Sequence, residues 1–132
     1  MVEGPAESRK VVVLVVEPDP HVRALERYFL EQAGYSVEFC GDGATALERV
    51  RVLQPVFLVS EILVPRMDGL SVCRAIKGDA ATRHVIVLIF SILAAEDRAR
   101  EAGADGFLRK PLNDVTLVQT VQRLLVQHGK KG

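Results

Sequence analysis

Five short apolar runs recur along the chain, and each has the length and composition of a β-strand. They cover residues 11–16, 35–40, 56–60, 85–90 and, more weakly, 106–108. Three of these runs are continuously apolar and rich in β-branched residues, which is typical of strands that are buried on both faces of a parallel sheet. We therefore expect a sheet that helices cover on both sides.

Segments with helical spacing separate the runs. We expect helices at residues 20–33, 42–53, a short stretch after 68–69, 93–102 and 113–128. The first helix is the best marked: Asp19 can cap its free amides, Pro20 stands where its missing N–H costs nothing, and Gly34 can end it in a left-handed conformation. Its inward stripe is expected to comprise Val22, Leu25, Phe29 and Leu30.

Strand and helix thus alternate five times. Right-handed crossovers convert this order into a doubly wound α/β fold with an open parallel sheet. A chain of 132 residues has the size of one domain. Sites in such folds lie at the carboxyl ends of the strands, so the residues that follow each strand are the candidates for chemistry.

The composition narrows the function classes. Lys and Arg number 17 and Asp and Glu number 17, so the formal net charge is 17 − 17 = 0 with histidine neutral. This balance offers no basic surface for nucleic acid or for an anionic membrane. The first residues lack the order of a signal peptide, and the apolar runs are too short to cross a bilayer. Cys40 and Cys73 indicate no disulfide framework, so a reducing cytoplasm fits best.

Acids, a hydroxyl and a lysine follow four of the predicted strands. They are Glu17 and Asp19 after the first, Glu61 after the third, Ser91 after the fourth and Lys110 after the fifth. Three carboxylates at one edge repel one another unless a cation lies among them, and that cation can be Mg²⁺ or the ammonium of Lys110. A hydroxyl and an ammonium opposite a carboxylate suit acyl-phosphate chemistry or its relic. Taken singly, each residue also fits a structural role, such as capping a helix.

Several longer motifs give the chain a resemblance to a known family. They are Asp-Pro-His-Val-Arg at 19–23 behind a Val-Val-acid opening, Glu-Gln-Ala-Gly-Tyr at 31–35, Asp-Gly at 42–43, Pro-Arg-Met-Asp-Gly-Leu at 65–70 and Gly-Ala-Asp-Gly-Phe-Leu-Arg-Lys-Pro at 103–111. On these motifs, residues 10–127 resemble the receiver domain of two-component response regulators, with 1–9 and 128–132 as flexible tails. The resemblance implies a flavodoxin-like sheet of strand order 2-1-3-4-5 and a cytoplasmic role in phosphorelay signalling.

Two positions depart from the family pattern. The resemblance places the phosphorylated residue, an aspartate in the family, at Glu61, four residues before Pro65. The acid that binds the metal directly in the family falls on Pro18, which has no side-chain ligand, and leaves Glu17 as the first acid of that pair. We interpret Asp19 as a helix cap rather than as a replacement ligand. We therefore expect neither phosphorylation of the usual Mg²⁺-dependent kind nor a resident metal.

Other residues of the family's phosphate-sensing site are kept. Ser91 stands at its hydroxyl position, Lys110 at its lysine and Phe107 at its switch aromatic. The next residue after the hydroxyl, usually small, is the bulky Ile92, which is expected to obstruct the pocket. Glu61 leaves two alternatives. Its longer side chain can pair with Lys110 and Ser91 and mimic the activated state, or it can point at water.

The leading hypothesis is a divergent receiver domain that is not an enzyme and works as a protein-interaction module without a cofactor. The resemblance implies a histidine kinase or an output domain as the partner, and a surface made by the fourth helix, fifth strand and fifth helix that can also form a homodimer. The candidate exposed positions on that surface are Ala95, Arg98, Arg109, Gln119, Gln122 and Arg123.

Two alternative functions would require other residues in the sequence. A working phosphoacceptor would use Glu61 or a neighbouring acid with Mg²⁺ held by Glu17, Asp19 and Glu61, and Pro18 speaks against it. A flavin-binding protein of the same topology would need hydroxyl and amide donors for a phosphate after the first strand. Residues 17–20 are instead two acids and two prolines.

Overall fold

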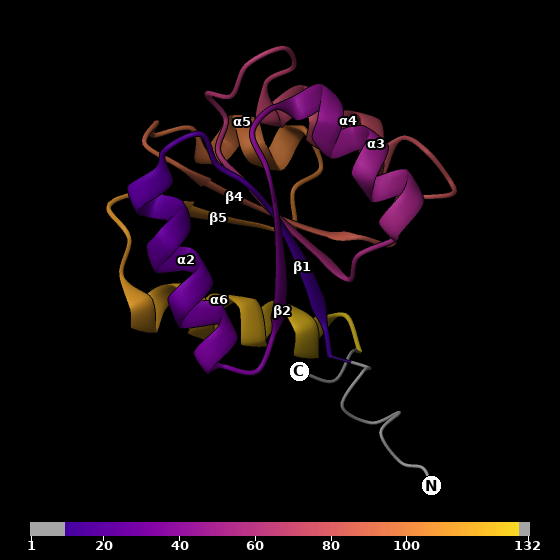
Figure 1. The fold of residues 1–132 in the computed structure, drawn as a ribbon. Coiled ribbons are helices and arrows are strands. Elements are labelled where there is room, and N and C mark those ends of the chain that lie inside the picture. Colours follow the sequence, from indigo (N-terminus) through magenta and orange to yellow (C-terminus); the bar gives the residue numbers. More distant parts are fainter. Residues whose placement is uncertain (1–9, 130–132) are drawn as a thin grey trace, which may run out of the picture.

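A computed structural model describes residues 10–129, in which five parallel strands form one sheet between two layers of helices (Figure 1). The elements in chain order are β1 (Val12–Val16), α2 (Pro20–Gln32), β2 (Ser36–Cys40), α3 (Gly43–Leu53), β3 (Phe57–Ser60), α4 (Gly69–Lys77), β4 (Ile86–Ser91), α5 (Glu96–Glu101), β5 (Gly106–Arg109) and α6 (Asp114–Gln127). The strands lie in the order β2-β1-β3-β4-β5, so the predicted flavodoxin-like fold is confirmed.

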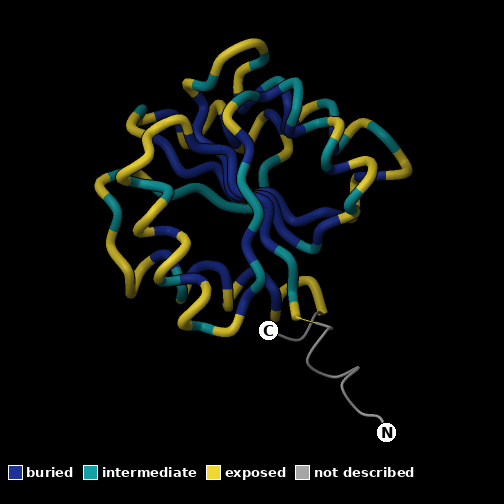
Figure 2. Tube along the Cα trace, viewed as in Figure 1, coloured by how far each residue is buried: buried dark blue, intermediate teal, exposed yellow. Residues whose placement is uncertain are grey.

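Alternation along the strands divides the apolar core into two clusters. In β1, Leu14 and Val16 pack in the cluster under α3, α4 and α5, whereas Val13 and Val15 pack in the cluster under α2 and α6. Successive side chains of a strand point to opposite faces, so a continuously apolar strand contributes to both. Figure 2 shows the buried strands at the centre of the molecule and exposed positions on the outer surfaces of the helices. The prediction of a sheet covered on both sides is confirmed.

Short polar side chains begin four of the helices. Asp19, Asp42, Asp68 and Asn113 each accept a hydrogen bond from a backbone N–H in the first turn of α2, α3, α4 and α6. Such a cap satisfies an amide that has no partner within its helix and is typically worth about 1 kcal/mol. The predicted cap at Asp19 is therefore confirmed. Gly34, with φ of 98°, follows α2 in the expected left-handed conformation.

The buried stripe of α2 differs from the predicted one. Leu25 is 47% exposed, whereas the neighbouring Glu26 is 1% exposed. Val22, Glu26 and Leu30 are spaced four residues apart and therefore lie along one side of the helix. The prediction of Leu25 as an inward residue is wrong, because a glutamate takes the inward position and turns the neighbouring leucine toward solvent.

Helix α5 is shorter than predicted. It covers Glu96–Glu101 instead of 93–102. The amide of Leu93 donates to Ser91 Oγ at 3.1 Å, so the chain forms a turn after β4 before the helix begins. All five strands, in contrast, begin and end within one residue of the predicted runs.

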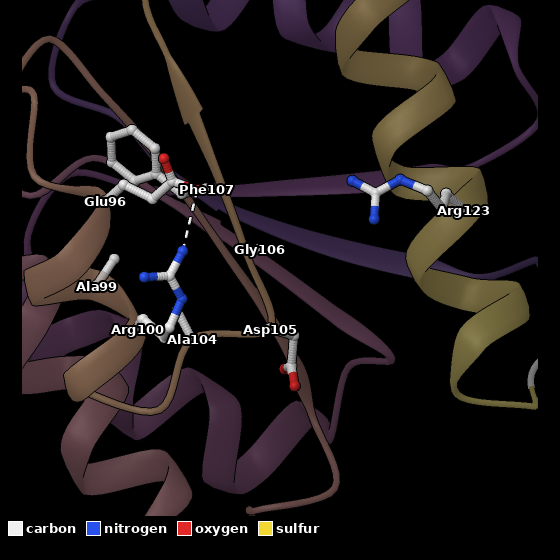
Figure 3. Close-up of a pocket in the computed structure, with 8 residues that line it drawn as sticks. All are labelled: Glu96, Ala99, Arg100, Ala104, Asp105, Gly106, Phe107 and Arg123. Atoms are coloured by element: carbon white, nitrogen blue, oxygen red, sulfur yellow. Dashed lines mark hydrogen bonds and ion pairs between the residues drawn. The ribbon is translucent and has the colours of Figure 1, made fainter.

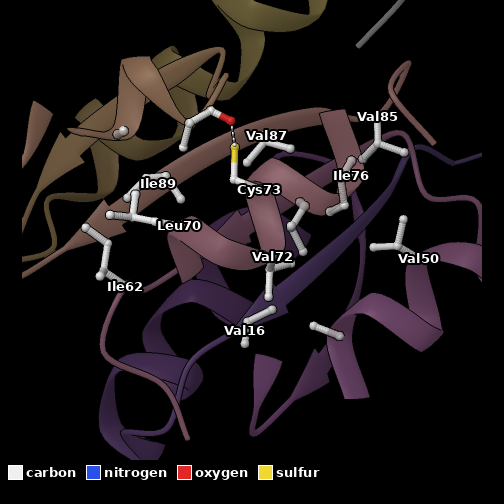
Figure 4. Close-up of a cluster of buried hydrophobic side chains, with 14 of the residues drawn as sticks. Val16, Val50, Ile62, Leu70, Val72, Cys73, Ile76, Val85, Val87 and Ile89 are labelled. Carbon is white, nitrogen blue, oxygen red and sulfur yellow. Dashed lines mark hydrogen bonds between the residues drawn. The ribbon is translucent and has the colours of Figure 1, made fainter. Parts of the chain in front are cut away.

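Both cysteines are buried and free. Cys73 on α4 lies among aliphatic side chains, and its Sγ donates to the carbonyl oxygen of Ala102 at 3.4 Å (Figure 4). Burial raises the pKa of the Cys73 thiol to about 11, so this cysteine is an unreactive core residue. No disulfide joins Cys40 and Cys73, as expected.

His128 lies inside the folded part of the chain. We expected the C-terminal tail to begin there, but His128 Nδ1 lies 2.8 Å from Leu124 O and Nε2 lies 3.2 Å from Asp105 Oδ1. That expectation is wrong for this residue, because its ring ties the end of α6 to the start of β5. The other predicted tail positions, 1–9 and 130–132, lie outside the described residues. Between residues 10 and 129, no helix is both long and apolar enough to span a membrane.

Candidate functional site

Four side chains meet at the carboxyl edge of the sheet. Glu17 follows β1, Glu61 follows β3, Ser91 ends β4 and Lys110 follows β5. The two glutamates and the serine are buried. In the register of the sheet the last residues of β1 and β3 are partners, and so are the last residues of β4 and β5. Strands β1 and β3 therefore end level with each other, as do β4 and β5, while β4 extends two residues beyond Ser60, whose partner is Ile89. All four side chains lie at this same edge because the strands are parallel.

Lys110 joins the two glutamates. Its Nζ lies 2.7 Å from Glu17 Oε1 and 3.0 Å from Glu61 Oε1. Burial alone would lower the pKa of the ammonium, but its hydrogen bonds to Glu17 and Glu61 raise the pKa above the ordinary value. Lys110 thus supplies the positive charge that two buried carboxylates need in order to lie side by side.

The carboxylate of Glu61 accepts hydrogen bonds from two side chains and three backbone amides. Oε2 accepts from the Ser91 hydroxyl and the amides of Ile62 (2.6 Å) and Leu63 (3.1 Å), and Oε1 accepts from the Ile92 amide (3.1 Å) and the Lys110 ammonium (3.0 Å). Burial would raise the pKa of Glu61, but the bonds from Ser91, Lys110 and the amides lower it below its ordinary value. A carboxylate offers about four acceptor sites, so these five donors leave none free.

The alternative in which Glu61 points at water is wrong. Its side chain is 4% exposed, and its three amide donors come from the loops after β3 and β4. The amide of Ile92 faces Glu61, while the Ile92 side chain is 58% exposed. The Ile92 side chain, which we expected to obstruct the pocket, thus lies largely in solvent.

A glycine lets the loop after β3 close against α4. A Cβ atom on Gly69 would lie 2.3 Å from the carbonyl oxygen of Glu61. The Gly69 amide also donates to the carbonyl oxygen of Ile62 at 2.9 Å. Only glycine permits so close an approach of two backbones. Gly69 therefore sets how close α4 lies to the site, and the preceding residue, Asp68, caps the helix.

Asp19 and Pro18 lie outside this cluster. Both are exposed, and the Asp19 carboxylate accepts from the amide of His21 at the start of α2. The carboxylates of Glu17 and Glu61 are already paired with a lysine. Among residues 10–129, no three His, Cys, Asp or Glu side chains are grouped to hold a metal. The residues present do not fit the Mg²⁺ site that the resemblance implies.

The predicted interaction face is exposed, with one exception. The exposed positions are Arg98, Arg109, Gln119, Gln122 and Arg123. Ala95 is 5% exposed, so its prediction as a surface residue is wrong. It directly precedes α5 and packs in the apolar cluster on that side of the sheet.

Phe107 lies at the centre of this face. Its ring is partly buried against the apolar cluster under α5. It borders one surface hollow together with Arg98 and Arg109, and a second one that Arg100 and Arg123 flank from α5 and α6 (Figure 3). In that second hollow Arg100 pairs with Glu96, whereas Arg123 lies across β5 from them.

The backbone of one residue, Ile92, connects the face with the buried site. Arg109 Nε donates to the carbonyl oxygen of Ile92 at 2.8 Å, while the amide of Ile92 donates to Glu61. Sequence reasoning missed this contact and the three amide donors, because every residue carries these backbone groups. It also missed Glu26, whose signal was available in its spacing of four residues from Val22 and from Leu30.

Comparison with known proteins shows the family to which the chain belongs. Residues 13–122 match the family model of the response regulator receiver domain. Over 116 residues the chain is 38% identical to response regulator MprA of Mycobacterium tuberculosis, covering 87% of this chain and 50% of MprA. It is 36% identical over 116 residues to response regulator PleD of Caulobacter vibrioides, covering 86% of this chain and 25% of PleD. The chain therefore spans half the length or less of these curated relatives.

A solved structure shows the same fold. A putative response regulator from Chloroflexus aurantiacus aligns with a TM-score of 0.85 and 27% identity, over 89% of this chain and 99% of that one. The family match, the strand order and the curated relatives agree. The chain therefore belongs to the response regulator receiver domains, the signalling modules of two-component systems.

Proposed function

We propose that this receiver domain is not phosphorylated in the usual Mg²⁺-dependent way and acts as a protein-interaction module rather than as an enzyme. The observation that carries the proposal is the carboxylate of Glu61, which is buried and engaged by five hydrogen-bond donors. A phosphoacceptor must offer an oxygen lone pair to the incoming phosphorus. Glu61 would have to give up existing hydrogen bonds to do so.

Two further differences from the family pattern support the proposal. The extra methylene of a glutamate moves its carboxylate by about 1.5 Å, and a misplacement near 1 Å can cost on the order of 10² in rate. Pro18 provides no metal ligand, although a divalent ion normally neutralises the charge on a transferred phosphoryl group. The two differences act independently, so repairing one leaves the other.

The proposal includes a role for Glu61 as a mimic of the activated state. The resemblance assigns the hydroxyl and the lysine of the site to sensing a phosphoryl group, and here Ser91 and Lys110 contact Glu61. These contacts hold the loop after β4, whose Ile92 carbonyl is bound by Arg109 of the interaction face. The partner would be a histidine kinase or an output domain that recognises this face, or a second copy of the chain.

The test is a phosphorylation experiment read by intact mass. The protein is incubated with Mg²⁺ and a small acyl-phosphate donor, beside a Glu61→Asp/Pro18→Asp double variant. We expect no adduct on the unmodified chain and one phosphoryl group on the double variant. The two single variants separate the effect of the acceptor from that of the metal ligand.

An adduct on the unmodified chain would overturn the proposal. It would support the alternative, a working phosphoacceptor with Mg²⁺ held by Glu17, Asp19 and Glu61. Peptide mapping would then identify the modified residue, since an adduct on Glu61 itself would also exclude its role as a mimic.

The interaction face is tested separately through the oligomeric state. Arg98→Glu combined with Arg123→Glu reverses two charges on the face, and both side chains are exposed. If the chain forms a dimer through this face, sedimentation velocity should show the variant shifted to monomer. Arg51→Glu, an exposed position on α3, is the matched control and should leave the dimer intact.

A further inference from the structure

Glu26 is a carboxyl group buried in an apolar position. It lies on α2 between Val22 and Leu30, which belong to the apolar cluster under α2 and α6. It is 1% exposed, and its Oε1 has no hydrogen-bond partner among the described residues. An unpaired charge in such a place is costly, so the protonation state of Glu26 affects how α2 packs.

The charged groups that act on Glu26 come from the ends of three strands. Glu17 and Glu61 repel a charge on it, and Lys110 attracts one. The ammonium of Lys110 already serves the two other glutamates. Ionisation of Glu26 would therefore place three carboxylates around one cation.

Neither the arginines of α2 nor the side chains of α6 in this cluster offer Glu26 a further cation. On α2, Arg23 donates to the carbonyl oxygen of Glu17, and Arg27 pairs with Glu31 and lies over the Phe39 ring. From α6, the side chains that enter the same cluster are apolar, namely Leu117, Val121, Leu124 and Leu125. The buried site at the strand ends and the packing of α2 are thus linked through a single lysine.

We propose that protonation of Glu26 controls how tightly α2 packs on the sheet. With the proton bound, the carboxyl is neutral and the helix lies against the apolar cluster. When the proton leaves to solvent, the buried charge favours arrangements in which α2 moves outward and water reaches the carboxylate. This inference does not depend on whether Glu61 is phosphorylated.

The direction of the pH dependence follows from linkage. Burial, reinforced by Glu17, raises the pKa of Glu26 from 4.5 to about 8 in the folded chain. The folded state then holds a proton that the unfolded state has lost, so stability falls as the pH rises from about 4.5 to about 8 and stays level above that. One such group raises the unfolding equilibrium constant about tenfold per pH unit within this window.

The experiment combines a titration with amide hydrogen exchange. The side-chain carboxyl carbon of Glu26 is followed by ¹³C NMR from pH 5 to 9. Exchange rates of the α2 amides, corrected for the intrinsic effect of pH, are compared with those of α3, which packs on the other face of the sheet. We expect Glu26 to titrate near pH 8 and the protection of α2 to fall between about pH 4.5 and 8 and to level off above that. Amides of α3 that exchange through local opening, and not through global unfolding, should keep their protection.

Two variants complete the test. Glu26→Gln keeps the shape and cannot ionise, so its α2 protection should not depend on pH, and the tenfold loss per pH unit should vanish from its unfolding equilibrium. Glu48→Gln, exposed on α3, should behave like the unmodified chain. Titration of Glu26 near 4.5, or equal pH effects on α2 and on the α3 amides that exchange through local opening, would overturn the proposal, and both readouts can be made on the unmodified chain alone.

Discussion

Lys110 is the residue on which the buried site depends. Two carboxylates lie within 3.0 Å of its ammonium, and the lysine side chain is 13% exposed. Removal of one partner from a buried ion pair leaves an uncompensated charge, which costs more than the pair itself contributes. Here the loss would leave two like charges facing each other.

We expect Lys110→Met to destabilise the fold by about 3 kcal/mol or more, measured by urea denaturation at pH 7. The methionine keeps the unbranched apolar stem of the lysine up to Cε, so the change removes mainly the charged group. Arg27→Met is the control, because that arginine forms an ion pair that is half exposed and worth about 1 kcal/mol at most. Similar midpoints for both variants would show that the folded chain does not need the charge of Lys110.

Glu61 gives the site an acid dependence. Its pKa in the folded chain is below the ordinary value of 4.5, so its stabilising contribution is present above about pH 4.5 and is lost as the pH falls through the folded-state pKa. Glu61→Gln should therefore lose less stability between pH 4.5 and 2.5 than the unmodified chain. Glu26 does not interfere, since its effect lies above pH 4.5.

The measurement is a set of urea denaturation curves across that acid range. Parallel pH profiles for the two chains would contradict the assigned contacts of Glu61. Asp68→Asn is a useful comparison, because the pKa of Asp68 is also lowered, by hydrogen bonds from Ser71 that overcome its burial, at a position outside the site. Asp68→Asn should remove the pH dependence of stability that comes from Asp68 and leave unchanged the part that comes from Glu61.

At the scale of elements, the start of α3 packs tightly against the loop that leads from β3 to α4. A Cβ atom on Gly43 would lie 1.7 Å from the carbonyl oxygen of Met67. The Gly43 amide donates to the carbonyl oxygen of Pro65 at 3.1 Å. A side chain there would have to push the two segments apart.

Gly43→Ala should consequently destabilise the chain by about 2–3 kcal/mol, while Gly41→Ala should change it by about 0.5 kcal/mol or less. The matched control is two residues away and has no atom within 4 Å of its would-be Cβ. Thermal or urea unfolding of both variants provides the comparison. Equal losses of stability in the two variants would show that the loop between β3 and α4 shifts at no cost in free energy.

The elements themselves could be predicted because their signals are local. A continuous apolar run defines β4, and Asp19 followed by Pro20 marks the start of α2 whatever the rest of the chain does. The errors arose where hydrophobicity is a poor guide to which side of a helix is buried or to where a helix begins. Glu26 takes an inward position of α2 that hydrophobicity assigned to Leu25, and α5 starts late because the Leu93 amide is used by Ser91.

The candidate site was predictable to a similar degree. Side chains at strand ends meet because the topology brings every carboxyl end to one edge, so Glu17, Glu61, Ser91 and Lys110 could be grouped from the sequence. The backbone donors could not, since an amide is aimed by the shape of its loop and not by the residue that carries it. The same limit applies to the bond between Arg109 and the Ile92 carbonyl.

At the scale of the whole molecule, the sheet separates two apolar clusters that share no side chain. Neighbouring residues of β3 belong to different clusters: Leu58 lies in the one under α3, α4 and α5, and Val59 in the one under α2 and α6. Val87 is the register partner of Leu58 and lies in the same cluster. The arrangement predicts which substitutions couple.

Leu58→Ala and Val59→Ala should be additive in their free energies of unfolding to within about 0.5 kcal/mol, although they are adjacent in sequence. Leu58→Ala and Val87→Ala should instead deviate from additivity by about 0.5 kcal/mol or more, because both substitutions would leave voids in the same apolar cluster. Urea denaturation of the single and double variants gives both coupling energies. A larger coupling for the adjacent pair would contradict the separation of the core by the sheet.

The five hydrogen bonds to Glu61 also affect the lifetime of the activated state. A phosphoryl group on a carboxylate is lost by hydrolysis, which gives a phosphorylated receiver domain a finite lifetime in its activated state. Glu61 is a permanent part of the chain, so hydrolysis does not end the contacts that it makes with Ser91 and Lys110. Under the proposed function, the duration of the signal is set by how fast the cell makes and degrades this protein and by how its partners compete for it.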